Sequence, residues 1–125
     1  MKIFIRFSVY STQMTLDQLV QNVDCQPTRV WSAGTLRGKT QIVEKNNGFM
    51  IESEYCDCDD LDAILNQFLK KLKINKDRLD SALDKVMVLL RCIVYSENNP
   101  PIYFSSDAIS CISRLNADFD IDLYV

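Results

Sequence analysis

The chain opens on the stretch Lys2-Ile3-Phe4-Ile5-Arg6-Phe7-Ser8-Val9-Tyr10, in which apolar residues recur at every second position. Side chains on a β-strand alternate between its two faces, so the odd-numbered residues from Ile3 to Val9 form one wholly apolar face. The even-numbered residues, with Phe4 and Tyr10 among them, form the other face. Residues 2–10 are therefore predicted to be a strand that buries one side beneath a covering layer.

A helix at 60–73 is predicted to supply much of this layer. Leu61, Leu65, Phe68 and Leu72 lie on one apolar stripe of that helix and are expected to be buried. Three further helices are predicted at 15–23, which opens with a capping box, at 76–84, and from Ser105 or Ser106 to Asn116.

Further strands are predicted at 38–45, 48–56, 86–95, 102–104 and 118–125. The turn sequence Asn46-Asn47-Gly48 favours a hairpin between the first two, and the turn at 98–101 favours one between the third and fourth. An ordered connection, anchored by Trp31, is expected at 27–34, ahead of the strand predicted at 38–45. Because short connections favour antiparallel pairing, the predicted fold is α+β: a mixed, mostly antiparallel sheet with helices packed on one face, a two-layer sandwich.

The composition fits a single domain spanning 1–125. The chain has 125 residues, of which 47% are hydrophobic and 25% charged, and this is enough to bury a core. Its net charge is −3 and its pI about 4.8, whereas nucleic-acid-binding proteins usually carry a basic stripe. The sequence has no signal-peptide pattern and no apolar run near ~18 residues. The expected location is the cytoplasm, with no nucleic-acid or membrane partner.

The sequence offers no recognisable catalytic, metal or cofactor site. Histidine is absent, which removes the commonest general base and the commonest metal ligand. The three glycines are too dispersed to form a phosphate-binding loop. A structural zinc site needs four ligands, and Cys56 and Cys58 supply only two. We therefore interpret this segment as the end of a strand followed by a capped helix. We therefore expect no enzyme activity, no metal and no cofactor.

The least ordinary feature is a run of six carboxylates in eleven residues, with no Lys or Arg among them. Its members, with the tyrosine inside the run, are Glu52, Glu54, Tyr55, Asp57, Asp59, Asp60 and Asp62. This run is the candidate surface for docking a basic partner protein, with Tyr55 as the apolar anchor. The alternative is a solvated strand face followed by acids that cap a helix. A second acidic set, Asp118, Asp120 and Asp122, shares one strand face and should be exposed or paired with a cation.

Four features, in order along the chain, resemble a known family. A strand and a helix open the chain, and the element Pro27-Thr28-x-x-Trp31-x-x-Gly34 follows. Gly48-Phe49-x-x-Glu52-Ser53 then precedes the long amphipathic helix, and Asp120-Ile121-Asp122-Leu123-Tyr124 follows the closing helix. The pattern resembles the bacterial "domain of unknown function 4279" family over nearly the whole chain, with Phe49 where many relatives carry Trp.

That family has no established activity. The resemblance implies a small bacterial cytosolic protein of a kind encoded beside secreted toxins, where it would act as an immunity protein. Such a protein needs only to bind one toxin tightly, which agrees with an acidic chain without catalytic motifs.

Three functions of different classes remain. The first is a non-enzymatic immunity protein that binds and neutralises a cognate bacterial toxin, such as a basic nuclease, through the acidic run. The second is a regulatory module that binds a small ligand or peptide in a groove near Trp31. The third is an enzyme of unfamiliar type that uses carboxylates, which would require acids with raised pKa inside a cleft.

Overall fold

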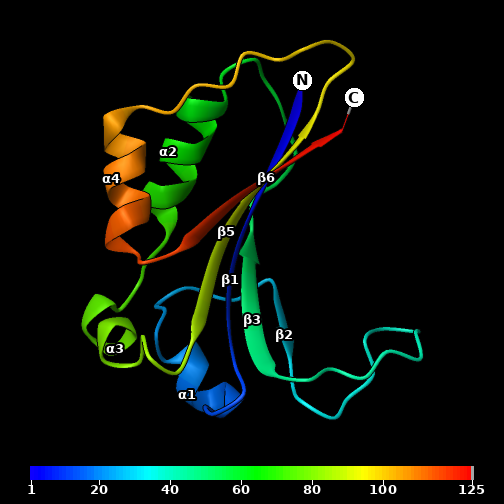
Figure 1. Cartoon of the computed structure of the whole chain (residues 1–125), viewed down its shortest axis with the longest axis vertical. Coiled ribbons are helices and arrows are strands. Elements are labelled where there is room, and N and C mark those ends of the chain that lie inside the picture. The colour runs from blue at the N-terminus through cyan, green and yellow to red at the C-terminus, as the bar shows by residue number, and fades with distance from the viewer. Residues whose placement is uncertain (125) are drawn as a thin grey trace.

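The computed structural model describes residues 1–124, in which six strands form one mixed sheet beside four helices (Figure 1). The strands are β1 (Lys2–Ser11), β2 (Arg29–Trp31), β3 (Asn47–Glu52), β4 (Cys56–Asp57), β5 (Met87–Tyr95) and β6 (Asp118–Tyr124). The helices are α1 (Leu16–Val20), α2 (Leu61–Lys71), α3 (Lys76–Ser81) and α4 (Ser106–Arg114). The predicted α+β class, with a mixed and mostly antiparallel sheet, is confirmed.

Strand β1 is the centre of the sheet, whose strand order is β2-β3-β1-β5-β6. It pairs antiparallel with β5 on one side, and with β3 and then β4 on the other. Strand β2 pairs antiparallel with β3. Strand β6 lies parallel to β5, because α4 carries the chain back between them.

The predicted strand 48–56 is interrupted at 53–55. Here the backbone N–H of Ser53 donates to the carbonyl of Ile5 at 2.8 Å, and the N–H of Ile5 donates to Ser53 Oγ, also at 2.8 Å. A side-chain oxygen thus satisfies a donor of β1 while the neighbouring backbone turns away. The interruption leaves Glu54 and Tyr55 exposed before pairing resumes at β4.

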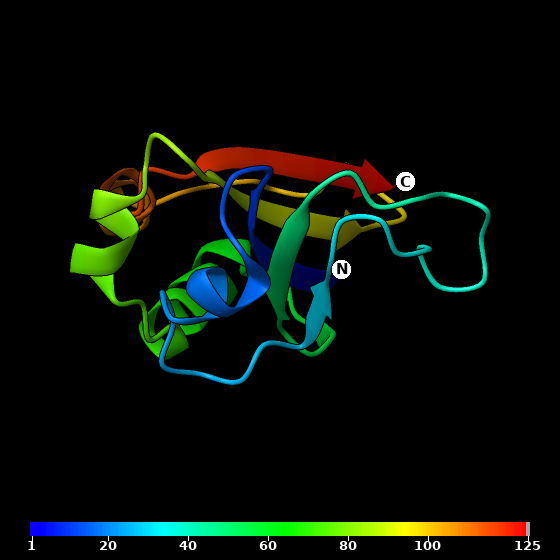
Figure 2. The ribbon, with the colours of Figure 1, turned by 90° about the horizontal axis from the view of Figure 1, so that it is seen from below.

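The helices cover the face of the sheet formed by the odd-numbered residues of β1 (Figure 2). The four side chains from Ile3 to Val9 on that face are at most 1% exposed, as their alternation predicts. The same buried cluster takes one or more residues from every helix, including Leu19, Leu65, Phe68, Leu79, Ala108 and Ile112. On α2, only Leu72 departs from the expected burial; it is partly buried because it is the C-cap residue, where the helix ends.

The strand predicted at 38–45 is wrong. These residues belong to a loop, 32–46, that holds an isolated bridge between Leu36 and Val43. Ile42 and Val43 are 52% and 50% exposed, so the β-branched side chains that suggested a strand have no layer to pack against. The strand that pairs with β3 on the side away from β1 is instead β2, inside the expected connection 27–34. The predicted hairpin turn is also wrong, since Asn47 and Gly48 begin β3.

The short strand predicted at 102–104 is wrong as well, and β5 forms no hairpin with it. Ile102 and Tyr103 are exposed, and Phe104 packs edge-on against Phe119 of β6, with 5.0 Å between ring centroids. The place beside β5 that a hairpin strand would take is filled by β6.

Candidate functional site

The helix-free face of the sheet carries two groups of side chains of chemical interest. At one end of this face, Tyr95 is in register with both Lys2 and Tyr124. Further along, Arg6 of β1 lies directly opposite Arg91 of β5. We call the first group the aromatic row, made of Phe4, Tyr55, Tyr95 and Tyr124. We call the second the arginine groove, made of Arg6, Arg29, Arg37 and Arg91 together with Trp31.

The aromatic row is a continuous series of ring contacts. Phe4 stacks on Tyr55 and Tyr95 stacks on Tyr124, each pair with ring centroids 4.9 Å apart, and 6.3 Å separates the rings of Tyr55 and Tyr95. The three tyrosines are 61%, 40% and 51% exposed in chain order, so a large aromatic surface faces solvent. The nearby Tyr55 hydroxyl, and then burial, raise the pKa of Tyr95. Tyr95 is therefore uncharged at neutral pH.

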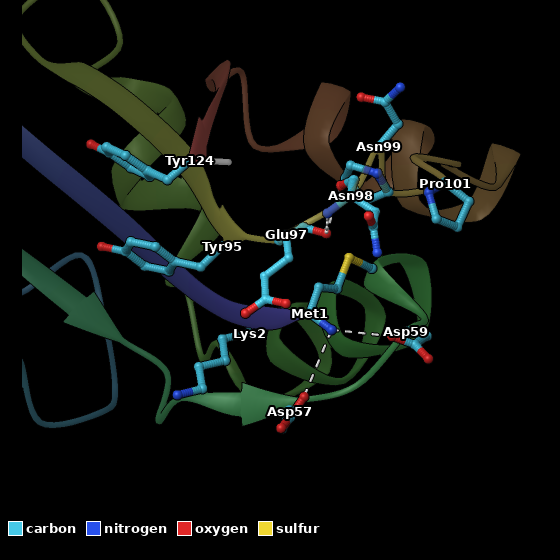
Figure 3. A pocket seen from close by; sticks show the side chains of 12 residues that line it. Met1, Lys2, Asp57, Asp59, Tyr95, Glu97, Asn98, Asn99, Pro101 and Tyr124 are labelled. Atoms are coloured by element: carbon cyan, nitrogen blue, oxygen red, sulfur yellow. Dashed lines mark hydrogen bonds and ion pairs between the residues drawn. The ribbon is translucent and has the colours of Figure 1, made fainter.

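A cavity of about 820 Å³ lies beside the aromatic row (Figure 3). Its walls include Tyr95, Tyr124 and the segment 96–101. The N-terminal ammonium of Met1 lies 3.1 Å from Asp59 and 3.7 Å from Asp57. The hydrogen bond to Asp59 raises the pKa of this amine. Both carboxylates remain largely exposed, so they keep free oxygens for a partner.

The structure divides the predicted acidic surface into two parts. Three of its acids have partners within the strands and helices of the fold. Glu52 pairs with Arg6 at 3.8 Å, and Asp60 caps α2 by accepting a hydrogen bond from the Ala63 N–H. Asp62 accepts from the backbone and the hydroxyl of Ser105, which ties α2 to the start of α4. Glu54, Tyr55, Asp57 and Asp59 are exposed, although Asp57 and Asp59 also pair with the Met1 ammonium.

Three residues at this end were not predicted from the sequence. Tyr95 and Tyr124 extend the row that Tyr55 begins, and Glu97 adds an exposed carboxylate beside the cavity. Tyr95 and Tyr124 stand at the ends of β5 and β6, where only the strand register shows that they are neighbours. The alternation of 2–10 did place Phe4 on this face.

The arginine groove encloses about 250 Å³ on the same face of the sheet. Its lining is Arg6, Ser8, Tyr10, Arg29, Trp31, Arg37, Glu44, Asn46, Met50, Leu89 and Arg91. Arg91 binds Asp120 through Nε at 3.0 Å and Nη2 at 2.9 Å, and its Nε lies 3.6 Å from Asp122. The cation expected beside the second acidic set is therefore Arg91.

Trp31 is half-buried at the edge of the groove, as an anchor of its segment. Its indole N–H donates to Asn46 Oδ1 at 2.8 Å, and the Arg29 guanidinium lies 5.4 Å from its ring centroid. Gly48, its register partner on β3, provides the space for the ring. The groove near Trp31 that the sequence suggested is present, and its wall carries four guanidinium groups, each of which is paired with a carboxylate.

Glu44 fastens the 32–46 loop to this wall. Its side chain is only 6% exposed and accepts hydrogen bonds from Arg37 Nε at 2.9 Å and from Arg29 Nη2 at 3.4 Å. The backbone of Glu44 also bonds to Gly34 and Thr35. The hydrogen bond from Arg37 holds the pKa of Glu44 below its usual value, against the opposing effect of burial.

We expect Glu44→Gln to lower the free energy of unfolding at neutral pH by about 1–2 kcal/mol, because the charge-assisted hydrogen bonds from Arg37 and Arg29, both largely exposed to water, are weakened. Because the pKa of Glu44 is lower in the folded state than in the unfolded state, its ionised form stabilises the fold at pH values above the unfolded-state pKa of about 4.3. This stabilisation is lost as the pH falls through the folded-state pKa. The difference from wild type should therefore shrink below about pH 4. Urea unfolding at several pH values measures it.

The exposed Glu54 gives a matched control for this experiment. Glu54→Gln should change the unfolding free energy little at any pH, within about 0.5 kcal/mol. A difference for Glu44→Gln that stays constant down to about pH 3 would contradict the assigned ion pair.

The cysteines do not add a reactive centre to either group. Burial raises the pKa of the Cys92 thiol to about 12, so this residue is a core side chain rather than a nucleophile. Cys56 and Cys58 are free thiols, and Cys58 Sγ accepts a hydrogen bond from the Asp60 N–H. In residues 1–124, no three or more acidic or cysteine side chains come together as a metal site would require.

Comparison with known proteins gives one finding. A family model described as "Domain of unknown function (DUF4279)" matches residues 1–125. No curated protein and no solved structure matches the chain. None of the helices described for residues 1–124 has the length and apolar character needed to cross a bilayer.

Proposed function

The chain belongs to the family of the domain of unknown function DUF4279, and we propose that it is a non-enzymatic binding protein of the bacterial cytoplasm. Its function in this proposal is that of an immunity protein, which binds a cognate toxin domain and blocks it. The docking surface is the aromatic row with the exposed carboxylates Glu54, Asp57, Asp59 and Glu97 around it.

One observation carries this proposal: three exposed tyrosines lie in a row, with Tyr55 stacked on Phe4 and Tyr95 stacked on Tyr124, next to carboxylates that still have free oxygens. Tyrosine is enriched at the residues that dominate binding energy in protein interfaces. Stacked rings have already lost much of their rotational freedom, so binding costs them little further entropy. An aromatic centre with a charged rim is the usual composition of a protein interface.

The charge of this surface favours a cationic partner. A nuclease toxin must carry a positive groove to hold phosphates. Acidic side chains at the rim of the aromatic row would be drawn to such a groove and would compete with its nucleic-acid substrate. Rim charges act mainly on the association rate, whereas the buried anchor acts on the dissociation rate. The two contributions can therefore be measured separately.

The test is the binding rate between the purified chain and the toxin domain encoded beside it. The variant Glu54→Lys/Asp57→Lys/Asp59→Lys should associate at least tenfold more slowly at low salt and lose most of the salt dependence of that rate. Glu52 is left in place because it pairs with Arg6. Asp60 and Asp62 are left in place because they support α2 and α4.

A matched control changes the net charge by the same amount elsewhere. Asp17, Asp24 and Asp84 are exposed and lie at the other end of the sheet, near α1 and α3. If Lys substitution of these three slows association as much as the first variant does, net charge alone explains the effect.

Tyr55→Ala should leave the association rate unchanged and raise the dissociation rate by about tenfold or more. An unchanged dissociation rate would remove the aromatic row from the interface.

The arginine groove favours a second candidate function, the binding of a small ligand near Trp31. Its guanidinium-lined wall differs in chemistry from the acidic surface proposed for the toxin, so one partner of uniform charge would not suit both. The two surfaces share the helix-free face of the sheet but are separable by mutation.

A further inference from the structure

We propose that the arginine groove binds a phosphate group, either as free phosphate or as a small phosphate monoester. The inference does not depend on the proposed toxin partner, because it concerns the groove between β1, β5, β2 and the 32–46 loop. Four guanidinium groups line this groove. Glu44, which pairs with Arg29 and Arg37, is the one carboxylate among the lining residues, and the carboxylates that pair with Arg6 and Arg91 stand outside it. Guanidinium groups match phosphate oxygens in geometry and charge.

The first argument is an unsatisfied donor. Among residues 1–124, Arg6 Nε is the one buried side-chain nitrogen or oxygen without a hydrogen-bond partner. Its carboxylate neighbour, Glu52, lies 3.8 Å away, too far for a hydrogen bond. A buried polar group without a partner costs free energy, and such groups in native proteins often mark a site for an ion or ligand. Arg6 Nε therefore has an ion-pair partner in Glu52 but no hydrogen bond.

The second argument is the order of charges across the sheet. Four register partners form one row across strands β3, β1, β5 and β6, in the spatial order Glu52, Arg6, Arg91 and Asp120. The two arginines are therefore adjacent, and the two acids lie at the outer ends of the row. Like charges directly opposite one another on neighbouring strands are destabilising. An anion placed between the two guanidiniums removes that cost, and no acidic residue of the row stands between them.

The third argument is the shape and character of the groove. Its floor is formed by strand residues with little charge, Ser8, Met50 and Leu89. Its two apolar members, Met50 and Leu89, lower the local polarity, which strengthens charge interactions above them. Arg29 and Arg37 stand at the rim, already oriented by Glu44. A volume of about 250 Å³ is large enough for a phosphate with a small substituent.

The sole tryptophan of the chain lies in this groove and reports on binding. Sodium phosphate is titrated into the purified protein at constant ionic strength set with chloride, and Trp31 emission is followed. We expect a saturable change for phosphate and none for chloride. Arg6→Gln should weaken phosphate binding at least tenfold. Glu52→Gln should strengthen it about threefold or more, because it removes the carboxylate that competes for Arg6.

Arg114→Gln is the charge-matched control for Arg6→Gln. Arg114 is exposed on α4, away from the groove, and its replacement should leave phosphate binding unchanged.

A second titration with phosphoserine distinguishes free phosphate from a phosphate monoester as the ligand. Tighter binding than for free phosphate indicates a monoester ligand, whereas equal or weaker binding indicates free phosphate. The absence of saturable binding, equal binding by Arg6→Gln, or weaker binding by Glu52→Gln would overturn the proposal.

Discussion

Phe7→Ala is expected to lower the free energy of unfolding by about 3–5 kcal/mol, as removal of a buried aromatic ring does in other proteins. Phe7 is fully buried in the central strand β1, between Ile51 of β3 and Leu90 of β5 in register. Its removal leaves a cavity beneath the helices that strands on both sides cannot easily fill. Because domains are stable by only about 5–15 kcal/mol, this variant should be close to unfolding at physiological temperature.

Urea unfolding followed by far-ultraviolet circular dichroism measures this loss. Phe68→Ala on α2 should cost a similar amount, because its ring enters the same cluster from the helix layer. Tyr103→Ala is the control, since Tyr103 is 69% exposed in the connection to α4 and should change the stability by less than about 0.5 kcal/mol. A loss below about 1 kcal/mol for Phe7→Ala would mean that the buried face of β1 is assigned wrongly.

Gly48→Ala is expected to destabilise the protein by about 1–3 kcal/mol through overpacking. A Cβ atom at Gly48 would lie 2.9 Å from the Cβ of Tyr10, and closer still to the indole carbon Cζ2 of Trp31. The indole must therefore move, and its hydrogen bond to Asn46 is strained or lost. Since the chain has one tryptophan, a red shift of its emission reports the displacement directly.

Gly34→Ala separates this effect from ordinary backbone strain. Gly34 has φ +86°, a conformation that alanine adopts only at a cost, but nothing lies within 4 Å of the position its Cβ would take. Its replacement should cost about 1 kcal/mol and leave the Trp31 emission unchanged. Equal emission spectra for wild type and Gly48→Ala would show that the indole does not pack on Gly48.

The sequence was sufficient for the parts of the fold that local pattern determines. Alternation identified the buried face of β1, and the apolar stripe identified α2 with three of its buried residues. The Thr15 capping box is present with both of its reciprocal hydrogen bonds. In each case the hydrogen bonds or contacts join residues close in sequence, or all lie on one periodic face.

The pairing of strands that are far apart in the sequence could not be predicted as well. The sequence placed a strand at 38–45, because β-branched residues near a turn signal favour one, but nothing local shows that β3 pairs with β2 across a loop. The same limit applies to the candidate site. The acidic run is visible in the sequence, whereas the partners of Glu52 and Asp62 depend on where Arg6 and Ser105 lie in space. The aromatic row and the arginine groove likewise arise from strand register.

The position of β6 has a consequence for self-association. Among the described strands it is the last in the sheet, and its alternating sequence would be a ready template for a strand from another copy. Asp118, Asp120 and Asp122 put a carboxylate at every second position of this edge, and Arg91 neutralises only part of that charge. Two copies that approach edge to edge would bring their acids together. The same aspartates that hold Arg91 therefore protect the sheet from growing into a polymer.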